Sequence, residues 1–193
     1  MGKIVVSTNV SLDGVIQDPD GKEGFKHGGW FYQYVGKDLE AWVNNETDEV
    51  LHAEAMLLGR KSEEWLATRS QGRTEPWLAR MNDLPKYVVS STLKKPKWTN
   101  STVLKDGVNE VSKLKQEVGG EILVYGSYQL VRTLMEHRLV DEFRLTVFPV
   151  VLGAGERLFR ETTDKTSLRL VRSQTIGEGL LLVTYEVVRA ASL

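Results

Sequence analysis

Cysteine is the most informative absence from this sequence. None of the 193 residues is a cysteine, which excludes disulfide bonds, thiolate metal sites and a cysteine nucleophile. Histidine is also scarce: His27, His52 and His137 are scattered, so we expect no metal site. The triplet His52-Ala53-Glu54 resembles part of a zinc deaminase motif, but the cysteine ligands of that motif are missing. We expect this triplet on the polar side of a helix.

The sequence also lacks a charge bias and a long apolar run. The formal net charge is -1, which gives no reason to expect nucleic acid or an anionic membrane as a partner. No apolar segment approaches the roughly 20 residues that a membrane-spanning helix needs, and the first residues do not read as a signal peptide. With 41% hydrophobic and 26% charged residues, we expect one cytoplasmic globular domain over residues 1–193.

Hydrophobic patterns predict strands that alternate with helices and are followed by an all-strand ending. Residues 10–29 contain five glycines and are expected to form a long functional loop. Residues 68–84 are polar, contain Pro76 and are also expected to form a loop. The order favours an α/β fold with a mostly parallel sheet and an antiparallel C-terminal edge hairpin. The expected strands are 3–9, 55–58, 87–89, 102–104, 122–125, 142–148, 168–176 and 180–188, and the expected helices are 37–53, 61–67, 108–118 and 127–137.

Two strand-to-helix junctions carry residues suited to a phosphate group. In open α/β sheets, ligands bind at the carboxyl ends of strands. At Tyr125–Tyr128, Gly126 would let a phosphate approach the backbone, and the first helical turn would supply free N–H groups. At Gly59–Ser62, two cations and a hydroxyl follow a strand. Taken singly, the first junction is more simply explained as a routine capped turn, and the alternative for the second is a common exposed basic turn.

Two further strand ends fit the same interpretation. Ser90-Ser91-Thr92 offers hydroxyls to a phosphate or merely to its own turn. Pro149–Gly155 ends an apolar strand in a glycine-rich bend, which is either a tight turn or a platform for a flat ring. Four such junctions suggest a dinucleotide across the strand ends. The G-x-G-x-x-G fingerprint is absent, which disfavours an ordinary Rossmann site.

Six short motifs in a fixed order carry a family resemblance. The set resembles the dihydrofolate-reductase-like family, most closely the branch of the riboflavin-biosynthesis reductase C-terminal domain and its stand-alone bacterial relatives. The resemblance spans about residues 3–188 and implies a three-layer α/β/α sandwich that binds NADPH. The motifs are Ser11–Gly14, Leu57–Ser62, Val88–Leu93, Val124–Ser127, Val140–Phe143 and Pro149–Phe159.

The resemblance also implies roles for individual residues. Arg60 and Ser91 would contact the adenosine 2′-phosphate, and loop 11–29 would act as a mobile lid. Asn9, Val10 and Ile16 would border the nicotinamide. Ser62 would lie at the pyrophosphate, and the helix start at Gly126–Gln129 would receive it. The full set of expected cofactor residues is Asn9, Val10, Ile16, Gly59, Arg60, Lys61, Ser62, Ser90, Ser91, Tyr125, Gly126, Ser127, Tyr128, Gln129 and Leu130.

The chain departs from the family pattern at two places. Tyr125 and Tyr128 flank Gly126-Ser127, where the family often has smaller residues. Val15 stands where riboflavin reductases usually have a lysine, which weakens a ribosylaminopyrimidine substrate. The expected substrate is therefore a small heterocycle, such as a pterin or a pyrimidine.

Hydride transfer to such a substrate also requires a proton. Asp38 is the nearest counterpart, by order along the chain, of the dihydrofolate reductase acid; the alternative is a solvated carboxylate at a helix start. Asp13 is a second candidate and fits a loop organiser better, and water is a third source. The aromatic residues Trp30–Tyr32 would either line a heterocycle pocket or anchor the lid.

Three functional hypotheses follow. The first is an NADPH-dependent reductase of a small heterocycle. The second is a nucleotide-binding protein without catalysis, and the third is an interaction domain that dimerises through its apolar C-terminal strands. We expect a homodimer in any case, because exposed apolar edge strands often pair.

Overall fold

The computed structural model describes residues 1–70, 72–160 and 165–189. The chain divides into two compact units, each made of two segments. The first unit contains Met1–Val6 and Asn44–Val140, and the second contains Ser7–Val43 and Asp141–Leu193. The single domain expected over residues 1–193 stays a prediction.

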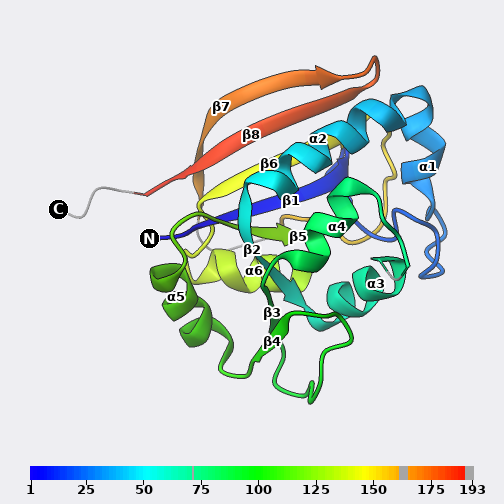
Figure 1. Cartoon of the computed structure of the whole chain (residues 1–193). Coiled ribbons are helices and arrows are strands. Elements are labelled where there is room, and N and C mark those ends of the chain that lie inside the picture. The colour runs from blue at the N-terminus through cyan, green and yellow to red at the C-terminus, as the bar shows by residue number, and fades with distance from the viewer. Residues whose placement is uncertain (71, 161–164, 190–193) are drawn as a thin grey trace. The chain divides into compact units, whose positions relative to one another are not determined.

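The first unit is built on parallel strands. Their order is β4-β3-β2-β5-β1, in which only the start of β1 belongs to this unit (Figure 1). Gly59 pairs with Val89, and Met56 pairs with Leu123, so the carboxyl ends of β2, β3 and β5 lie at one edge. The strands are β1 (Lys3–Ser11), β2 (Ala53–Gly59), β3 (Lys86–Val89), β4 (Ser101–Leu104) and β5 (Glu121–Tyr125).

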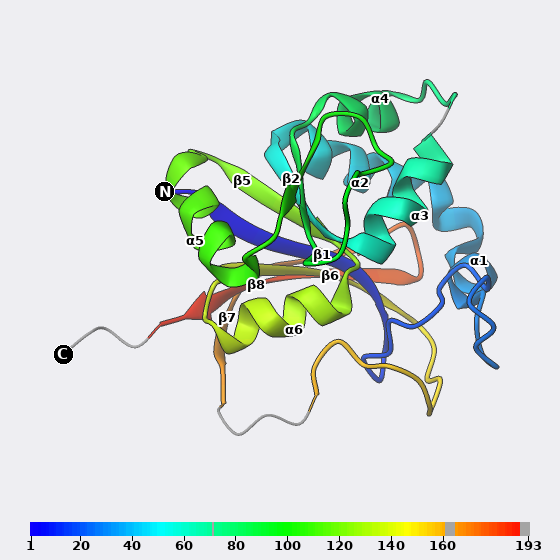
Figure 2. The ribbon, with the colours of Figure 1, turned by 90° about the horizontal axis from the view of Figure 1, so that it is seen from below.

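Helices cover both faces of these strands, which confirms the predicted three layers. Figure 2 shows α3 and α4 on one side of β2 and β5, and α5 and α6 on the other. On the first side, Leu66 of α3 and Leu78 of α4 pack with Met56 and Leu58 of β2. Alternate residues of β2, such as Leu57, are fully buried too, because strand side chains point to opposite faces. The helices are α2 (Leu39–His52), α3 (Arg60–Ser70), α4 (Pro76–Asp83), α5 (Gly107–Glu117) and α6 (Tyr128–Glu136).

The second unit is built on antiparallel strands. The end of β1 is followed in the sheet by β6 (Glu142–Phe148), β8 (Leu180–Val188) and β7 (Ser167–Ile176). Both β6–β8 and β7–β8 pair antiparallel, and Gly177 turns the β7–β8 hairpin with a φ of 60°. Because β1 appears in both strand orders, the structure confirms an eight-stranded, mostly parallel sheet with an antiparallel edge hairpin.

Aromatic packing anchors the helix that precedes α2. Trp30 and Phe31 begin the short helix α1 (Trp30–Val35), which the sequence did not predict, and pack on Phe148 with Leu180 and Leu182. The ring centroids of Trp30 and Phe148 lie 5.2 Å apart. Of the two roles left open for the aromatic run, Trp30 and Phe31 therefore take the anchoring one, while Tyr32 is exposed.

Two other expectations were wrong. Residues 68–84 are not simply a loop, because Pro76 starts α4 and its fixed φ suits the first helical turn. The His52-Ala53-Glu54 triplet does not lie on a helix: His52 ends α2, and β2 begins at Ala53. The carboxylate of Glu54 accepts a hydrogen bond from the Gly120 amide at 2.9 Å.

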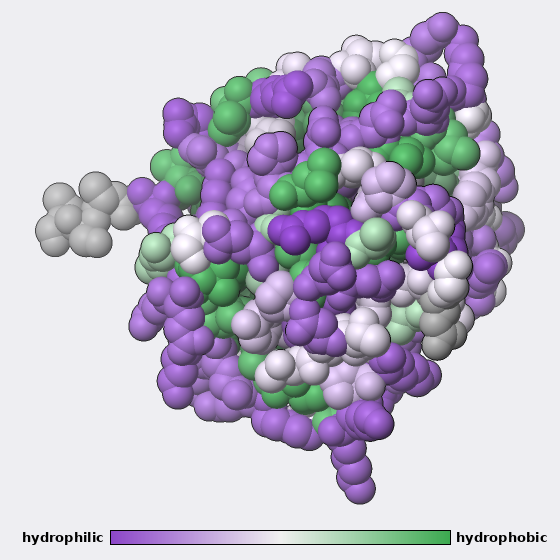
Figure 3. All heavy atoms as spheres, viewed as in Figure 1, coloured by the Kyte–Doolittle hydropathy of each residue, from purple (hydrophilic) through white to green (hydrophobic). Residues whose placement is uncertain are grey.

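The surface seen in Figure 3 is mostly hydrophilic, and apolar residues appear there in small separate areas. This agrees with the balanced charge of the sequence, which has 25 basic and 26 acidic side chains. Within the part of the chain that is described, no helix combines the length and apolar character needed to cross a membrane.

Candidate functional site

The ends of β2 and β5 meet through the hydroxyl of Ser127. Ser127 Oγ accepts a hydrogen bond from the Gly59 amide at 3.0 Å and donates one to Ser62 Oγ at 2.7 Å. Gly126, just before it, has a φ of 56°, which glycine adopts without strain. Three of the residues predicted at the phosphates, Gly59, Ser62 and Ser127, are thus brought together in the first unit.

The start of α6 is open to an acceptor. Ser127 stands at the N-cap in a left-handed conformation, and no side chain caps the helix. The first turn contains no acidic residue. Uncapped amides at a helix start favour a negative group, and the helix dipole adds to this preference. The expected residues here are Tyr128 and Gln129, which are partly or fully exposed, and Leu130, whose side chain is buried.

The cations and hydroxyls of the other two junctions stand at the same edge of the sheet. Arg60 and Lys61 are exposed and open α3 directly after Gly59. Ser90 follows Val89, the partner of Gly59 in β3, and its hydroxyl accepts a hydrogen bond from the Leu93 amide at 3.1 Å. The Ser90 hydroxyl therefore serves its own turn, whereas Ser91 is exposed.

A buried acid beside this edge escaped the sequence interpretation. Glu46 of α2 is 8% exposed, and its carboxyl group interacts with the Tyr125 side chain. Burial raises the pKa of Glu46 well above 4.5 and repulsion from Glu49 adds to the rise, while the interaction with Tyr125 opposes it. The only signal in the sequence was the i, i+3 spacing of two glutamates, which usually marks an exposed helix face.

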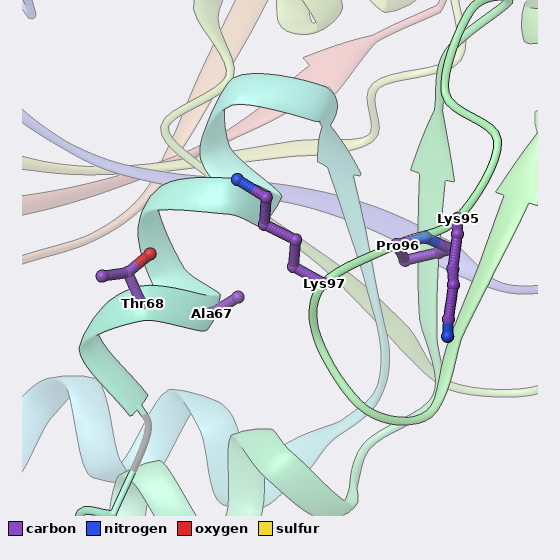
Figure 4. Close-up of a pocket in the computed structure, with 5 residues that line it drawn as sticks. All are labelled: Ala67, Thr68, Lys95, Pro96 and Lys97. Atoms are coloured by element: carbon purple, nitrogen blue, oxygen red, sulfur yellow. The ribbon is translucent and has the colours of Figure 1, made fainter.

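A separate open cavity of about 420 Å³ lies beside α3 (Figure 4). Ala67 and Thr68 of α3 and the loop residues Lys95–Lys97 line it, and Lys97 extends toward the helix. Glu63 holds this loop in place, because one of its carboxylate oxygens accepts hydrogen bonds from the Lys97 and Trp98 amides, both at 2.6 Å. No residue of this cavity belongs to the predicted cofactor set.

In the second unit, Asp13 joins two loops. Its carboxylate accepts hydrogen bonds from Ser11 Oγ at 2.7 Å and from the Leu152 and Gly153 amides at 3.1 and 2.9 Å. Burial raises the pKa of Asp13, but these hydrogen bonds outweigh it and lower the pKa from 3.8 to about 2. Asp13 is therefore an ionised acceptor that organises the loops, the role that the sequence favoured over an acid.

The same two loops are linked by backbone bonds. The Ile16 amide donates to Glu156 O at 2.9 Å, and the Leu158 amide donates to Gly14 O at 3.0 Å. Gln17 Oε1 accepts from the Glu156 amide at 3.0 Å. The first part of loop 11–29 is thus fastened to residues 150–158 within its own unit, and any lid motion of this part would carry both loops.

The rest of that loop is folded around Asp18, which the sequence interpretation also missed. Asp18 is 2% exposed, and its two oxygens accept hydrogen bonds from the Lys22, Glu23 and Phe25 amides at 2.7, 2.9 and 3.0 Å. Its position in a run of aspartates and glycines is the signal of an Asx-type turn.

The residues predicted at the nicotinamide lie at the end of β1 and just after it. Val10 and Ile16 are buried, with exposures of 4% and 8%. Asn9 is half-buried, and its Oδ1 accepts a hydrogen bond from Trp42 Nε1 at 3.0 Å. All three residues belong to the second unit.

Asp38 holds the β7–β8 hairpin. Its side chain is buried, and its oxygens accept hydrogen bonds from the Glu178 amide at 2.9 Å and the Gly179 amide at 2.8 Å. The carboxylate is thus not solvated, as the alternative role had assumed. The catalytic role of Asp38 stays a prediction, and its hydrogen bonds give it a structural task.

A family model decides what this combination of fold and junctions represents. The model of the RibD C-terminal domain matches residues 2–182. The chain belongs to the RibD C-terminal domain family. The resemblance drawn from the six sequence motifs is therefore confirmed, and this is a reductase-type family.

Two relatives of similar length occur in Bacillus subtilis (strain 168). The uncharacterized protein YyaP is 29% identical over 188 residues, which cover 95% of this chain and 94% of YyaP. The uncharacterized protein YwjB is 30% identical over 181 residues, which cover 93% of this chain and 95% of YwjB.

Solved structures share the fold of this RibD C-terminal domain. A protein of Shewanella sp. PV-4 assigned to riboflavin biosynthesis matches with a TM-score of 0.71 at 21% identity, over 97% of this chain and 99% of that chain. A pyrimidine reductase-like protein of Corynebacterium diphtheriae matches with a TM-score of 0.57 at 14% identity, over 97% of this chain and 92% of that chain. At these identities the likeness concerns the fold alone.

Proposed function

We propose that this chain is an NADPH-dependent reductase that transfers hydride to a small heterocycle, such as a pterin or a pyrimidine. The observation that carries the proposal is the bonded group of Gly59, Ser62 and Ser127 beside the uncapped start of α6. A phosphate is the ligand that such a group suits, because backbone amides, hydroxyls and the helix dipole all favour an anion. Membership of a reductase-type family supports the same proposal.

The proposal assigns residues of the chain to the two ends of the cofactor. Arg60 and Ser91 would hold the 2′-phosphate, since a guanidinium donates several hydrogen bonds in one plane to phosphate oxygens. Ser62 and the amides of Tyr128 and Gln129 would receive the pyrophosphate. Asn9, Val10 and Ile16 would border the nicotinamide. When bound, NADPH supplies the hydride from C4 of that ring.

The proton needs a separate source. Asp13 is held ionised by its hydrogen bonds, and both oxygens of Asp38 accept backbone amides. We therefore favour a water molecule as the proton donor. Hydride and proton then add across a C=N or C=O bond of the heterocycle.

NADPH oxidation followed across a panel of oxidised pterins and pyrimidines tests the proposal. A reductase consumes NADPH with at least one of them, and NADPH binding is separately read from tryptophan fluorescence. Binding without turnover across the panel would favour the alternative of a non-catalytic nucleotide-binding protein. Absence of binding would leave only the interaction domain.

A further inference from the structure

In the second unit, Phe31 and Trp42 fix the orientation of the side-chain amide of Asn9. The Phe31 ring packs edge-on against Trp42, with ring centroids 4.8 Å apart. Trp42 Nε1 in turn donates to Asn9 Oδ1 at 3.0 Å. Phe31 is buried in the aromatic cluster around Phe148, so the Trp42 ring rests on a fixed support.

The tryptophan determines which atom of Asn9 faces outward. An indole N–H only donates, so the oxygen of the Asn9 amide must face Trp42. The amide nitrogen Nδ2 then points the other way with two N–H groups. Within the described residues, the one hydrogen bond found for the half-buried Asn9 side chain is that of Oδ1, and Nδ2 is not among the buried atoms that lack a partner, so it is accessible to a ligand. A donor held in this way selects for an acceptor on a ligand.

We propose that Asn9, oriented by Trp42, is a specificity-determining residue whose Nδ2 donates a hydrogen bond to a carbonyl oxygen on a flat heterocyclic ring. The inference rests on the proposed reductase function. The carbonyl belongs either to the carboxamide of the nicotinamide ring or to a ring carbonyl of the substrate. Trp42 is the positioning residue, because it acts on the ligand only through the Asn9 amide.

Asn9→Asp is the variant that isolates the donor. It keeps the size of the side chain and the acceptor for Trp42, replaces the N–H groups by a second acceptor oxygen and adds a negative charge, whose effect both members of a matched ligand pair share. Two matched pairs of probes report on the lost donor: NADPH with its thioamide analogue, and 2-amino-4-oxopteridine with 2,4-diaminopteridine. Only the first member of each pair carries the carbonyl oxygen, since sulfur is a weak acceptor and the amino group donates.

The wild-type protein is expected to prefer the carbonyl member of one pair, and Asn9→Asp is expected to reduce the affinity for that member about tenfold or more. Loss of preference in the NADPH pair assigns the carbonyl to the cofactor, and loss in the pteridine pair assigns it to the substrate. If the variant changes neither preference while the wild type binds NADPH, this inference fails and the proposed function stands. If the wild type binds no NADPH, both fail.

Trp42→Phe tests the orienting step. Phenylalanine keeps the packing against Phe31 but removes the indole donor, so the Asn9 amide populates both flips and affinity falls about twofold or more. In an Asn9→Ala background, Trp42→Phe is expected to change nothing further, because the group it orients is gone. Equal losses in both backgrounds would contradict the positioning role. Trp65→Phe, at an exposed residue of α3, is the matched control.

Discussion

The side chain of Asp38 accepts a hydrogen bond from the backbone amide of Gly179, at 2.8 Å and 141 positions away in the chain. The neighbouring oxygen accepts from Glu178, so both oxygens of this carboxylate serve the β7–β8 turn. A group engaged in this way stabilises the fold whether or not it takes part in a reaction.

Asp38→Asn is expected to lower the free energy of unfolding by about 1–3 kcal/mol, because the new NH2 group faces a backbone amide that needs an acceptor. Urea unfolding measures this loss. Lys37→Ala is the control, since it removes only the exposed ion pair with Glu178, which is worth about 0–1 kcal/mol. Unchanged stability of Asp38→Asn together with lost turnover would instead identify Asp38 as the catalytic acid.

Asp13→Asn tests the hydrogen bonds by which the Asp13 carboxylate joins loop 11–17 to residues 150–158 in the second unit. The pKa of Asp13 is lowered to about 2 in the folded protein, so its stabilisation is present above the unfolded value near 3.8 and is lost as pH falls through 2. We expect the variant to be less stable by about 1 kcal/mol at neutral pH, with allowance for solvent screening.

Unfolding measured as a function of pH tests this account of Asp13. The difference in free energy of unfolding between wild type and Asp13→Asn should shrink as pH falls from about 4 to about 2. Glu23→Gln changes an exposed side chain outside the hydrogen-bonded loops 11–17 and 150–158, and it should show no such trend. A difference that stays constant through this pH range would mean that the carboxylate charge does not hold the loops.

For Glu46→Gln, we expect the difference in free energy of unfolding from wild type to change with pH in the opposite direction. The pKa of Glu46 is raised in the folded protein, so the folded state binds more protons and wild-type stability falls as pH rises above 4.5. Glutamine keeps the size and polarity of the side chain without the buried charge. The free energy of unfolding of the variant should therefore exceed that of wild type by on the order of 1 kcal/mol at alkaline pH and by little at acid pH. Thermal unfolding in matched buffers measures this difference. A variant that is less stable than wild type by the same amount at every pH would contradict a raised pKa of Glu46.

The sequence predicted those elements whose pattern is local. The strand-rich C-terminal region and its turn at Gly177–Gly179 appear where the alternation of apolar residues predicted them. Helix α4 was missed because Pro76 was interpreted as part of a loop, although it occupies the first helical turn. Its end is completed by Lys86, a fully buried lysine whose Nζ donates to the carbonyls of Met81, Asn82 and Leu84. These partners lie only two to five positions away, but the bonds depend on a lysine that is fully buried in the fold, which no local pattern indicates.

In the candidate site, too, features with a local sequence pattern were predicted and contacts between distant residues were not. The glycine and serine residues at the ends of β2 and β5 were found, because phosphate-type junctions have a local signature. The hydrogen bond between Trp42 and Asn9 was not, since it joins residues 33 positions apart. Likewise, the carboxylates of Asp13 and Asp38 find their amide partners only in the C-terminal third of the chain.

The expected homodimer remains a prediction that β7 allows to be tested. This strand stands at the end of the sheet order and exposes Leu168, Leu170 and Val171. We expect light scattering to give a dimer for the wild type and a monomer for Leu170→Lys. Leu51→Lys, at a residue of similar exposure in α2, should leave the mass unchanged. A wild-type monomer would end this prediction.

Calorimetric titration of wild type and Arg60→Ala with NADPH and NADH tests the central claim most directly. A guanidinium on the 2′-phosphate predicts that Arg60→Ala weakens NADPH binding about 10- to 100-fold and hardly affects NADH, which lacks that phosphate. Arg73→Ala, which removes an exposed cation paired with Glu75, should alter neither affinity. Equal NADPH affinity in wild type and Arg60→Ala would contradict the phosphate site at the end of β2.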